Sequence, residues 1–257
     1  ALYGRHGESP VVVMASSTPA NCFDYAFEAA RIAIEHMTPV ILLSDGYLAN
    51  GSELWKIPRV ADLPEIKTPL VKDNDPEYQP YLRNLETMAR SWAFPGQEGL
   101  RHHVGGLEKA DITGEISYDP YNHEKMTHAR AEKVARVLNR IPLQKVIGEP
   151  EGDLLVVGWG GTYGALYTAV QELIEDSKRI SLAQFNYILP LPSNVSEVFS
   201  RFRKIIVCEL NLGQFASYLR ANLPQFTYLQ YNKVQGLPFL ISELKLKFSD
   251  VLNTIEK

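Results

Sequence analysis

The first 43 residues alternate between apolar runs and a helical pattern, and this order limits the folds open to the chain. Residues 11–16 and 39–43 are apolar and predict two buried strands. Between them, Thr18-Pro19 is typical of a helix start, with a hydroxyl cap and proline at the first position. The apolar side chains of this helix recur at helical spacing, namely Phe23, Phe27, Ala30 and Ile34. A strand–helix–strand unit implies parallel strands and a right-handed crossover, so the sequence predicts an α/β fold.

The second apolar run leads into residues 42–52, which read Leu-Leu-Ser-Asp-Gly-Tyr-Leu-Ala-Asn-Gly-Ser. The Asp45-Gly46 step falls where the strand ends. In an open α/β sheet, ligands collect outside the carboxyl ends of the strands, so Asp45 and Asn50 would suit a site. Asp and Gly are also favoured in plain turns. A site and a simple turn are both open interpretations here.

A second alternation of strands and helices occupies the C-terminal part of the chain. This spacing predicts a three-layer α/β/α parallel sheet. A charged helix over 123–140 precedes it and is interpreted as a linker, so the domain boundary is placed between about 115 and 150. The expected elements are strands at 154–157, 181–185, 205–208 and 227–230, and helices at 162–175, from Ser193, and at 215–223.

Residues 53–122 differ from both flanking parts because prolines and glycines interrupt them repeatedly. So long an irregular stretch in a compact protein is usually functional or interfacial. Tyr78, Tyr81, Trp92 and Phe94 provide apolar surface to bury. We therefore expect this segment to be ordered and to wrap another subunit.

Composition excludes several function classes. The formal net charge of −4 argues against a nucleic-acid or anionic-membrane surface, and no apolar run approaches the roughly 20 residues that span a bilayer. Cys22 and Cys208 lie far apart in apolar segments, which predicts buried reduced thiols and a cytoplasmic location. The chain begins at Ala1 without Met and soon enters a buried strand, so we expect a fragment.

Three short motifs carry weak functional signals. The glycine-rich run 158–164 follows a strand, but a dinucleotide fingerprint would need its third glycine at Tyr163. A tight turn with close helix packing is favoured there, and an anion at the helix N-terminus stays open. His123 and His128 would lie about 140° apart on a helix, so no zinc site is expected. The neighbouring His102 and His103 diverge, which favours polar interface contacts over a proton-transfer role.

The N-terminal run Gly4-Arg5-His6-Gly7-Glu8 is either a solvated loop or a loop that contacts an anion or substrate. Two cysteines cannot supply the four thiolates of a conventional iron–sulfur cluster, so no cluster is expected on this chain. The sequence also contains no G-x-S-x-G or Walker motif.

Taken together, these strings closely resemble the α subunits of 2-oxoacid:ferredoxin oxidoreductases, most of all those of the 2-oxoglutarate type (2-oxoglutarate synthase). The resemblance covers essentially the whole chain. It is carried by residues 4–10 (Gly-Arg-His-Gly-Glu-Ser-Pro), 38–51, 101–108 (Arg-His-His-Val-Gly-Gly-Leu-Glu), 158–164, 190–194 (Pro-Leu-Pro-Ser-Asn) and 209–214 (Glu-Leu-Asn-Leu-Gly-Gln).

The resemblance implies a specific activity. The family oxidatively decarboxylates a 2-oxoacid with thiamine diphosphate, passes electrons through iron–sulfur clusters to ferredoxin, and forms an acyl-CoA. Its diphosphate–Mg²⁺ site belongs to a β subunit, so cofactor binding would span the interface, in a homo- or hetero-oligomer. A chain without a nucleophile, cluster or phosphate loop is compatible with one half of such a shared site.

The resemblance also implies a domain division. Residues 1–115 resemble the C-terminal half of a thiamine-enzyme pyrimidine-binding domain with an irregular arm, 116–150 a linker and helix, and 151–257 a transketolase C-terminal-like domain. The family's Tyr-Pro-Ile-Thr-Pro and Arg-Gly-Gly-Pro-Ser-Thr-Gly segments and its pyrimidine-activating carboxylate would precede Ala1. The 257 residues are therefore expected to be inactive alone.

Within these residues, His6, Asp45 and Asn50 are predicted to line or brace the catalytic site. Two other hypotheses stay open. The chain could be a non-catalytic α/β module that docks on a partner through residues 53–122, or a small-nucleotide binder that uses the 158–164 turn.

Overall fold

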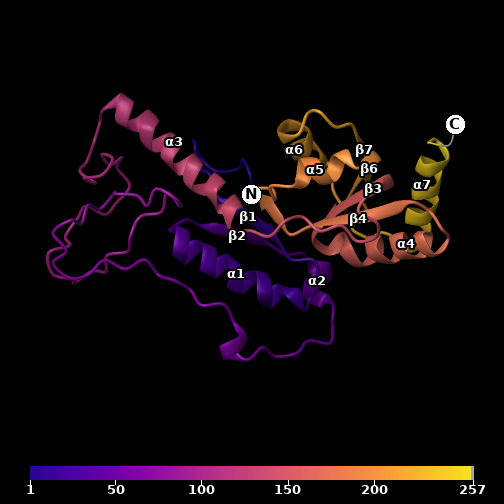
Figure 1. The fold of residues 1–257 in the computed structure, drawn as a ribbon, viewed down its shortest axis with the longest axis horizontal. Helices are drawn as coiled ribbons and strands as arrows, with labels where there is room; N and C mark the ends of the chain where they lie inside the picture. The colour runs from indigo at the N-terminus through magenta and orange to yellow at the C-terminus, as the bar shows by residue number, and fades with distance from the viewer. Residues whose placement is uncertain (256–257) are drawn as a thin grey trace. The chain divides into compact units, whose positions relative to one another are not determined.

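The computed structural model describes residues 1–255 and contains two compact units, each assembled from separate segments of the chain (Figure 1). The first unit consists of residues 1–14, 26–42 and 56–141. The second consists of residues 15–25 and 43–55 together with the chain from Pro142 onward. Each unit therefore depends on residues that lie far apart in the sequence.

The predicted strand–helix–strand pattern at the start of the chain is confirmed. Strand β1 (Val12–Ala15), helix α1 (Asn21–His36) and strand β2 (Val40–Leu43) follow one another, and β1 lies next to β2 in a sheet. All four residues of β1 are buried, as its apolar sequence predicts.

Helix α1 departs from the prediction at its start and in its buried face. It begins at Asn21 instead of Pro19, although the Thr18 hydroxyl does accept the Asn21 N–H at 3.1 Å. Its buried residues are Ala29, Ile32 and His36. Phe23 is exposed, and its ring contacts that of Trp55, at 5.5 Å between centroids.

The irregular character predicted for residues 53–122 is confirmed up to the start of α3. Helix α2 (Gly46–Asn50) precedes this segment, which holds a single 3-10 turn, η1 (Val60–Asp62). The Trp92 indole N–H donates to the Ile34 carbonyl at 2.8 Å, which ties the segment to α1. Phe94, one of the aromatic residues expected to provide apolar surface, is 52% exposed in the single chain. Helix α3 (Pro120–Arg136) and the turn η2 (Val137–Asn139) end the first unit's chain path.

The second unit contains a four-stranded parallel sheet in the order β4-β3-β6-β7. None of its helices, nor any other helix among residues 1–255, is long and apolar enough to cross a membrane. Its elements are β3 (Gly152–Trp159), η3 (Gly160–Thr162), α4 (Tyr163–Glu175), β4 (Ile180–Phe185), β5 (Tyr187–Leu189), α5 (Val195–Ser200), β6 (Phe202–Glu209), α6 (Gln214–Asn222), β7 (Tyr228–Asn232) and α7 (Ile241–Asn253).

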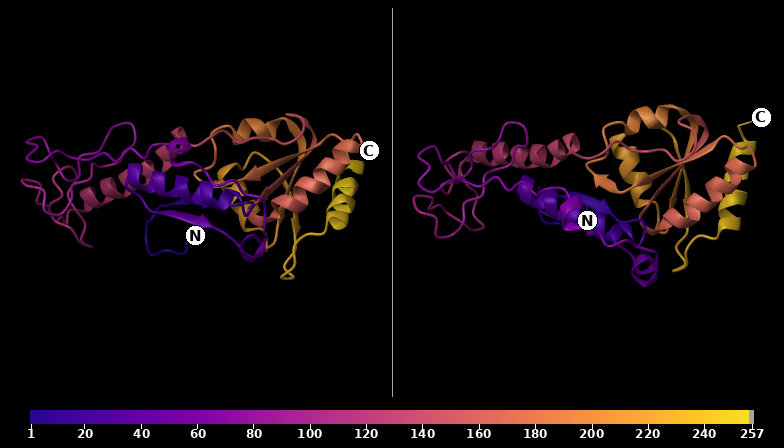
Figure 2. Two further views of the ribbon diagram at one scale, coloured as in Figure 1. Left: turned by 90° about the horizontal axis from the view of Figure 1, so that it is seen from below. Right: turned by 60° about the horizontal axis from the view of Figure 1, so that its bottom comes forward.

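Helices cover both faces of this sheet (Figure 2). On one face, strand residues such as Val156 and Ile206 pack against α4 and α7. On the other face, the ring of Phe185 contacts Phe199 of α5 and Phe215 of α6. Both faces of β3 are buried, which explains its nearly continuous apolar sequence. The unit is therefore a three-layer α/β/α structure, and the predicted α/β class is confirmed.

Candidate functional site

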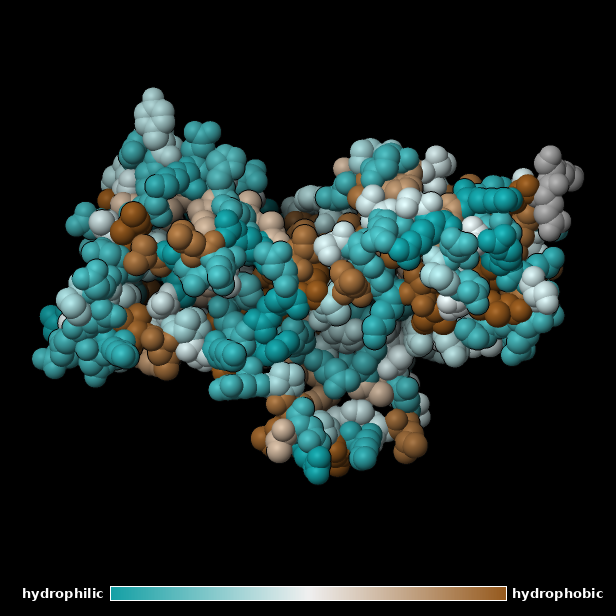
Figure 3. Space-filling view, viewed as in Figure 1, coloured by the Kyte–Doolittle hydropathy of each residue, from teal (hydrophilic) through white to brown (hydrophobic). Residues whose placement is uncertain are grey.

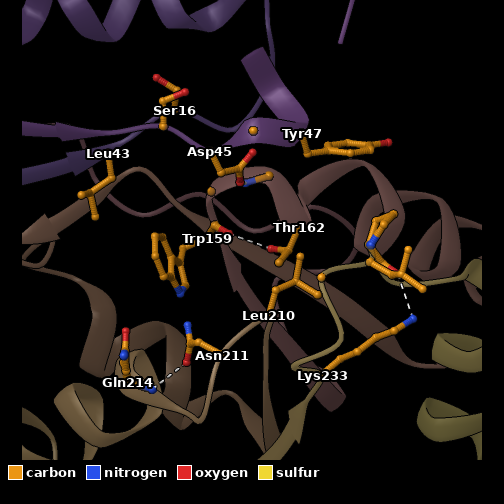
Figure 4. A pocket seen from close by; sticks show the side chains of 17 residues that line it. Ser16, Leu43, Asp45, Tyr47, Trp159, Thr162, Leu210, Asn211, Gln214 and Lys233 are labelled. Atoms are coloured by element: carbon orange, nitrogen blue, oxygen red, sulfur yellow. Dashed lines mark hydrogen bonds between the residues drawn. The ribbon is translucent and has the colours of Figure 1, made fainter. Parts of the chain in front are cut away.

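The order of the strands places a crevice at the carboxyl ends of β3 and β6. From β3 the chain runs outward to β4 on one side, then crosses to β6 on the other side. Such a reversal of strand order is where open α/β sheets bind ligands. A cavity of about 650 Å³ lies there (Figure 4), which we call the switch-point cavity. Residues from the strand ends line it, among them Asp45, Tyr47, Trp159, Gly161, Leu210, Asn211 and Lys233.

Asp45 is held in place by two backbone N–H groups. It caps the N-terminus of α2, where its Oδ1 accepts the Leu48 N–H at 3.0 Å. Its Oδ2 accepts the N–H of Gly161, in the glycine-rich turn, at 3.0 Å. Asp45, predicted from its place after β2, therefore caps α2 in the turn and also lines the cavity.

The glycine-rich turn approaches Asp45 so closely that a side chain at Gly161 would force the carboxylate to move. A Cβ at Gly161 would lie 2.3 Å from the Asp45 Oδ2, and one at Gly158 would lie 2.3 Å from the Leu166 Cδ1. The Gln184 amide donates to the Gly160 carbonyl at 3.1 Å and steadies the turn. The turn is thus built for close packing, and the anionic group that Gly161 binds is a carboxylate of the chain itself.

Glu209, at the end of β6, organises the opposite wall. It is fully buried, and it accepts the Phe215 and Ala216 N–H groups of α6, each at 2.9 Å. It also accepts the Trp159 indole N–H at 3.2 Å and the Asn211 amide at 2.9 Å. Because a negative charge at a helix N-terminus is stabilising, Glu209 fixes α6 and the two side chains that reach the cavity.

The predicted site residues did not include Glu209, Trp159 and Asn211. The sequence could have pointed to Glu209, because this residue comes directly after an apolar run, much as Asp45 does. The contact of Glu209 with Trp159 depends on the neighbouring positions of β3 and β6, which the sequence does not state.

The switch-point cavity combines an indole ring with hydrogen-bond acceptors. The Ser16 hydroxyl lines it, is buried, and has no hydrogen-bond partner among residues 1–255. The one ammonium group among the residues lining this cavity, that of Lys233, is paired with Glu243 at 2.7 Å. This chemistry suits a flat, nitrogen-bearing organic group better than a polyphosphate.

The other two predicted site residues lie elsewhere. The Asn50 amide donates to the Gly46 carbonyl at 2.7 Å within α2, so Asn50 braces the helix that Asp45 caps. His6 belongs to the first unit and lines a different cavity. In the same loop, the Arg5 guanidinium donates to the Ser9 carbonyl at 2.8 Å, so this side chain closes its own loop.

The remaining histidine and cysteine motifs occupy ordinary surroundings. The His102 Nδ1 lies 2.9 Å from the Leu100 carbonyl and 3.3 Å from the Tyr78 hydroxyl, so its polar contacts are within the chain. Within residues 1–255, no three His, Cys, Asp or Glu side chains are placed to hold a metal ion. Both cysteines are free thiols; Cys208 is buried as expected, whereas Cys22 is only half-buried. Burial raises the pKa of the Cys208 thiol.

Residues 1–118 match the family model described as pyruvate flavodoxin/ferredoxin oxidoreductase, thiamine diP-binding. The 2-oxoglutarate oxidoreductase subunit KorA of Mycobacterium tuberculosis is 46% identical over 250 residues, which are 95% of this chain and 37% of that protein. The α subunit of 2-oxoacid:ferredoxin oxidoreductase 2 of Aeropyrum pernix is 30% identical over 100% of this chain and 40% of that protein.

A solved structure shows the same fold. It is the 2-oxoglutarate:ferredoxin oxidoreductase of Magnetococcus marinus with 2-oxoglutarate, coenzyme A and succinyl-CoA bound, and it matches with a TM-score of 0.88 at 27% identity. The match covers 98% of this chain and 44% of that chain. The present chain therefore spans less than half the length of these proteins.

Proposed function

Because the chain belongs to the family of 2-oxoacid:ferredoxin oxidoreductase α subunits, we propose that it forms part of an enzyme that oxidatively decarboxylates 2-oxoglutarate to succinyl-CoA and passes the electrons to ferredoxin. The observation that carries this proposal is the 46% identity to a 2-oxoglutarate oxidoreductase subunit along nearly the whole chain. A cytoplasmic location, predicted from the cysteine content, belongs to the same proposal.

The proposal assigns the switch-point cavity to the organic end of thiamine diphosphate. The residues present fit that part of the cofactor, because they offer an indole ring, the Asp45 carboxylate and the unpartnered Ser16 hydroxyl. When bound, thiamine diphosphate supplies the electron sink that decarboxylation of a 2-oxoacid requires. The diphosphate with its Mg²⁺ is proposed to lie at the interface with a β subunit, and the iron–sulfur clusters and CoA elsewhere in the complex.

Asp45 is the residue of this chain that we propose to position the site. Its carboxylate already binds two N–H groups, so its orientation is set before any ligand enters. Asn50 supports it through α2. The part that His6 was predicted to play in the site stays a prediction.

We assign the irregular segment, residues 53–122, to the contact with the partner β subunit. Figure 3 shows apolar groups among polar ones over this segment, including the loop that carries η1. A monomer seldom exposes so many large apolar side chains without a use for them. The most exposed aliphatic ones are Leu54, Ile57, Val60, Leu85 and Val104, with between 77% and 100% of each accessible.

The substrate assignment is tested by CoA-dependent reduction of a low-potential dye by the intact complex, with 2-oxoglutarate and pyruvate compared. Reduction with 2-oxoglutarate alone is the expected result. Reduction with pyruvate would keep the family and overturn the substrate. No reduction with either, from a cluster-loaded complex, would favour the alternative of a non-catalytic assembly module.

The role of Asp45 is tested in the same complex with Asp45→Ala, for which we expect turnover to fall at least tenfold. The matched control is Asp24→Ala, which removes an exposed carboxylate of the second unit that does not line the cavity. Normal turnover in the Asp45→Ala complex would refute the assignment.

A further inference from the structure

A second cavity, of about 520 Å³, lies within the first unit and differs in character from the switch-point cavity. We call it the basic cavity, because cationic side chains outnumber carboxylates in its lining. The carboxylates are Glu8 and Glu108, and His6 also lines it. The cationic side chains are Arg83, Arg90, Lys109, Arg130 and Lys133.

The fold brings these cations together from two directions. Helix α3 supplies Arg130 and Lys133, which are three residues apart and so share one side of the helix. The irregular segment supplies Arg83 and Arg90, which face each other directly across an antiparallel β-bridge. Like charges placed opposite each other in this way are destabilising.

The positive charge of the cavity is poorly compensated by the chain. Glu108 accepts from Arg130 at 3.3 Å and lies 2.7 Å from His123. Among the described residues, no carboxylate lies within 4 Å of the charged nitrogens of the other four cations. The buried Nε of Arg83 also has no hydrogen-bond partner among residues 1–255.

The partners that the cations do have are neutral. The Lys109 ammonium, on a side chain only 3% exposed, donates to the carbonyls of Gly105 and Leu107. The Arg90 guanidinium lies 4.1 Å from the centre of the Tyr81 ring and donates to the Pro80 carbonyl at 3.2 Å. These contacts hold the cations in place without neutralising them.

Burial and the uncompensated charge both lower the pKa of Lys133. Burial and the repulsion of Arg90, Arg83 and Arg130 lower its pKa to about 8, although its ammonium donates to the Met37 carbonyl at 2.6 Å. Arg83, a half-buried cation nearby, also has a lowered pKa, because burial and Arg90 outweigh the attraction of Asp111. An anion bound in the cavity would relieve both effects.

We propose that the basic cavity is a binding site for the diphosphate group of a small molecule. Guanidinium groups bind phosphate oxygens through pairs of parallel N–H donors, and such charge-assisted bonds are among the strongest in proteins. The surplus of cations calls for a ligand with at least two negative charges. The volume lies within the range of small-molecule sites, roughly 300–1,000 Å³, so the ligand can carry an organic part beside Tyr81 and Met126.

The test is a calorimetric titration of the intact protein that carries this chain with inorganic pyrophosphate. Thiamine diphosphate and Mg²⁺ are kept saturating, so that the signal does not come from the cofactor's own diphosphate site. We expect saturable binding that weakens at least tenfold in Arg83→Gln and in Lys133→Gln. The matched control is Lys125→Gln, which removes an equal charge from α3 of the first unit at an exposed pair with Asp111; Lys125 lies outside residues 53–122 and does not line the cavity.

Sulfate, which carries its two charges on one tetrahedral group, is titrated alongside, and we expect no saturable binding at the same concentrations. Absence of pyrophosphate binding, equal weakening in Lys125→Gln, or sulfate binding as tight as pyrophosphate would each overturn the proposal. If Arg83→Gln fails to fold, Arg90→Gln replaces it, because half-buried Arg90 is bound through neutral groups. Full binding in both Lys133→Gln and Arg90→Gln would overturn the proposal as well.

Discussion

Replacing Gly161 by alanine tests the contact that joins the glycine-rich turn to Asp45. The new Cβ would lie 2.3 Å from Oδ2 and 2.8 Å from Oδ1 of Asp45. The carboxylate must therefore move and give up its bonds to the Gly161 and Leu48 N–H groups. A charge-assisted bond contributes about 1.5–3 kcal/mol and a helix cap about 1 kcal/mol. Because Asp45 is exposed, we take about 2 kcal/mol for the two together.

Alanine also stabilises a helical turn relative to glycine, by about 0.5–1 kcal/mol, so the net loss for Gly161→Ala is about 1 kcal/mol. Gly164→Ala is the matched control, since a Cβ at Gly164 meets nothing within 4 Å. That variant should gain about 0.5–1 kcal/mol. The two variants should therefore differ by about 2 kcal/mol, or about 4–8 °C in the melting temperature of a unit of this size.

The assay is thermal unfolding of the intact protein that carries each variant. An Asp45→Ala background provides the internal check, because the cost of Gly161→Ala should disappear once the carboxylate is gone. Equal melting temperatures for Gly161→Ala and Gly164→Ala, or an unchanged cost of Gly161→Ala beside Asp45→Ala, would refute this reasoning.

Three further predictions concern buried groups. Glu209→Gln should destabilise the second unit by about 2–4 kcal/mol in urea unfolding. The amide NH₂ of glutamine would face N–H donors that now bind the carboxylate, which accepts from four N–H groups. A loss below about 1 kcal/mol would contradict the role assigned to this carboxylate. The folded state lowers the Lys133 pKa from 10.5 to about 8, so the unfolded chain holds the proton more tightly and stability should rise between pH 8 and 10.5. Lys133→Met should lack this rise, and an identical pH profile in both proteins would count against it. The buried Cys208 thiol should react with a thiol reagent only after unfolding, whereas half-buried Cys22 should react in the native protein; equal native rates would be inconsistent with these environments.

The sequence was most informative where burial is simple. Strands β3 and β6 are covered on both faces, so their apolar runs could be recognised directly. Asp45 could be placed just after a strand because its position depends only on the neighbouring residues of β2 and α2. Helix α7 was not predicted, although Leu244 and Phe248 are at helical spacing, because its N-cap is Leu240 and not a hydroxyl or carboxyl residue.

Contacts between distant segments account for the other differences. Phe23 fits the apolar pattern of α1 but contacts Trp55, a residue of another segment. The bond between Asp45 and Gly161 joins residues 116 positions apart, and it exists only because a glycine allows the approach. No local pattern encodes which distant residue a side chain will meet.

The interleaved composition of the second unit has a consequence for how the chain is made and cut. Its sheet comes entirely from residues beyond Pro142, yet one wall of its cavity is supplied by residues 43–55. During synthesis, residues 15–25 and 43–55 can pack only after the chain beyond Pro142 has been made. Closing the long loop between these segments carries an entropic cost. A protease cut between the two parts would separate Asp45 from Gly161, and only re-association of the pieces would restore the cavity. A fragment of residues 142–257 alone would therefore contain the sheet but not the complete cavity.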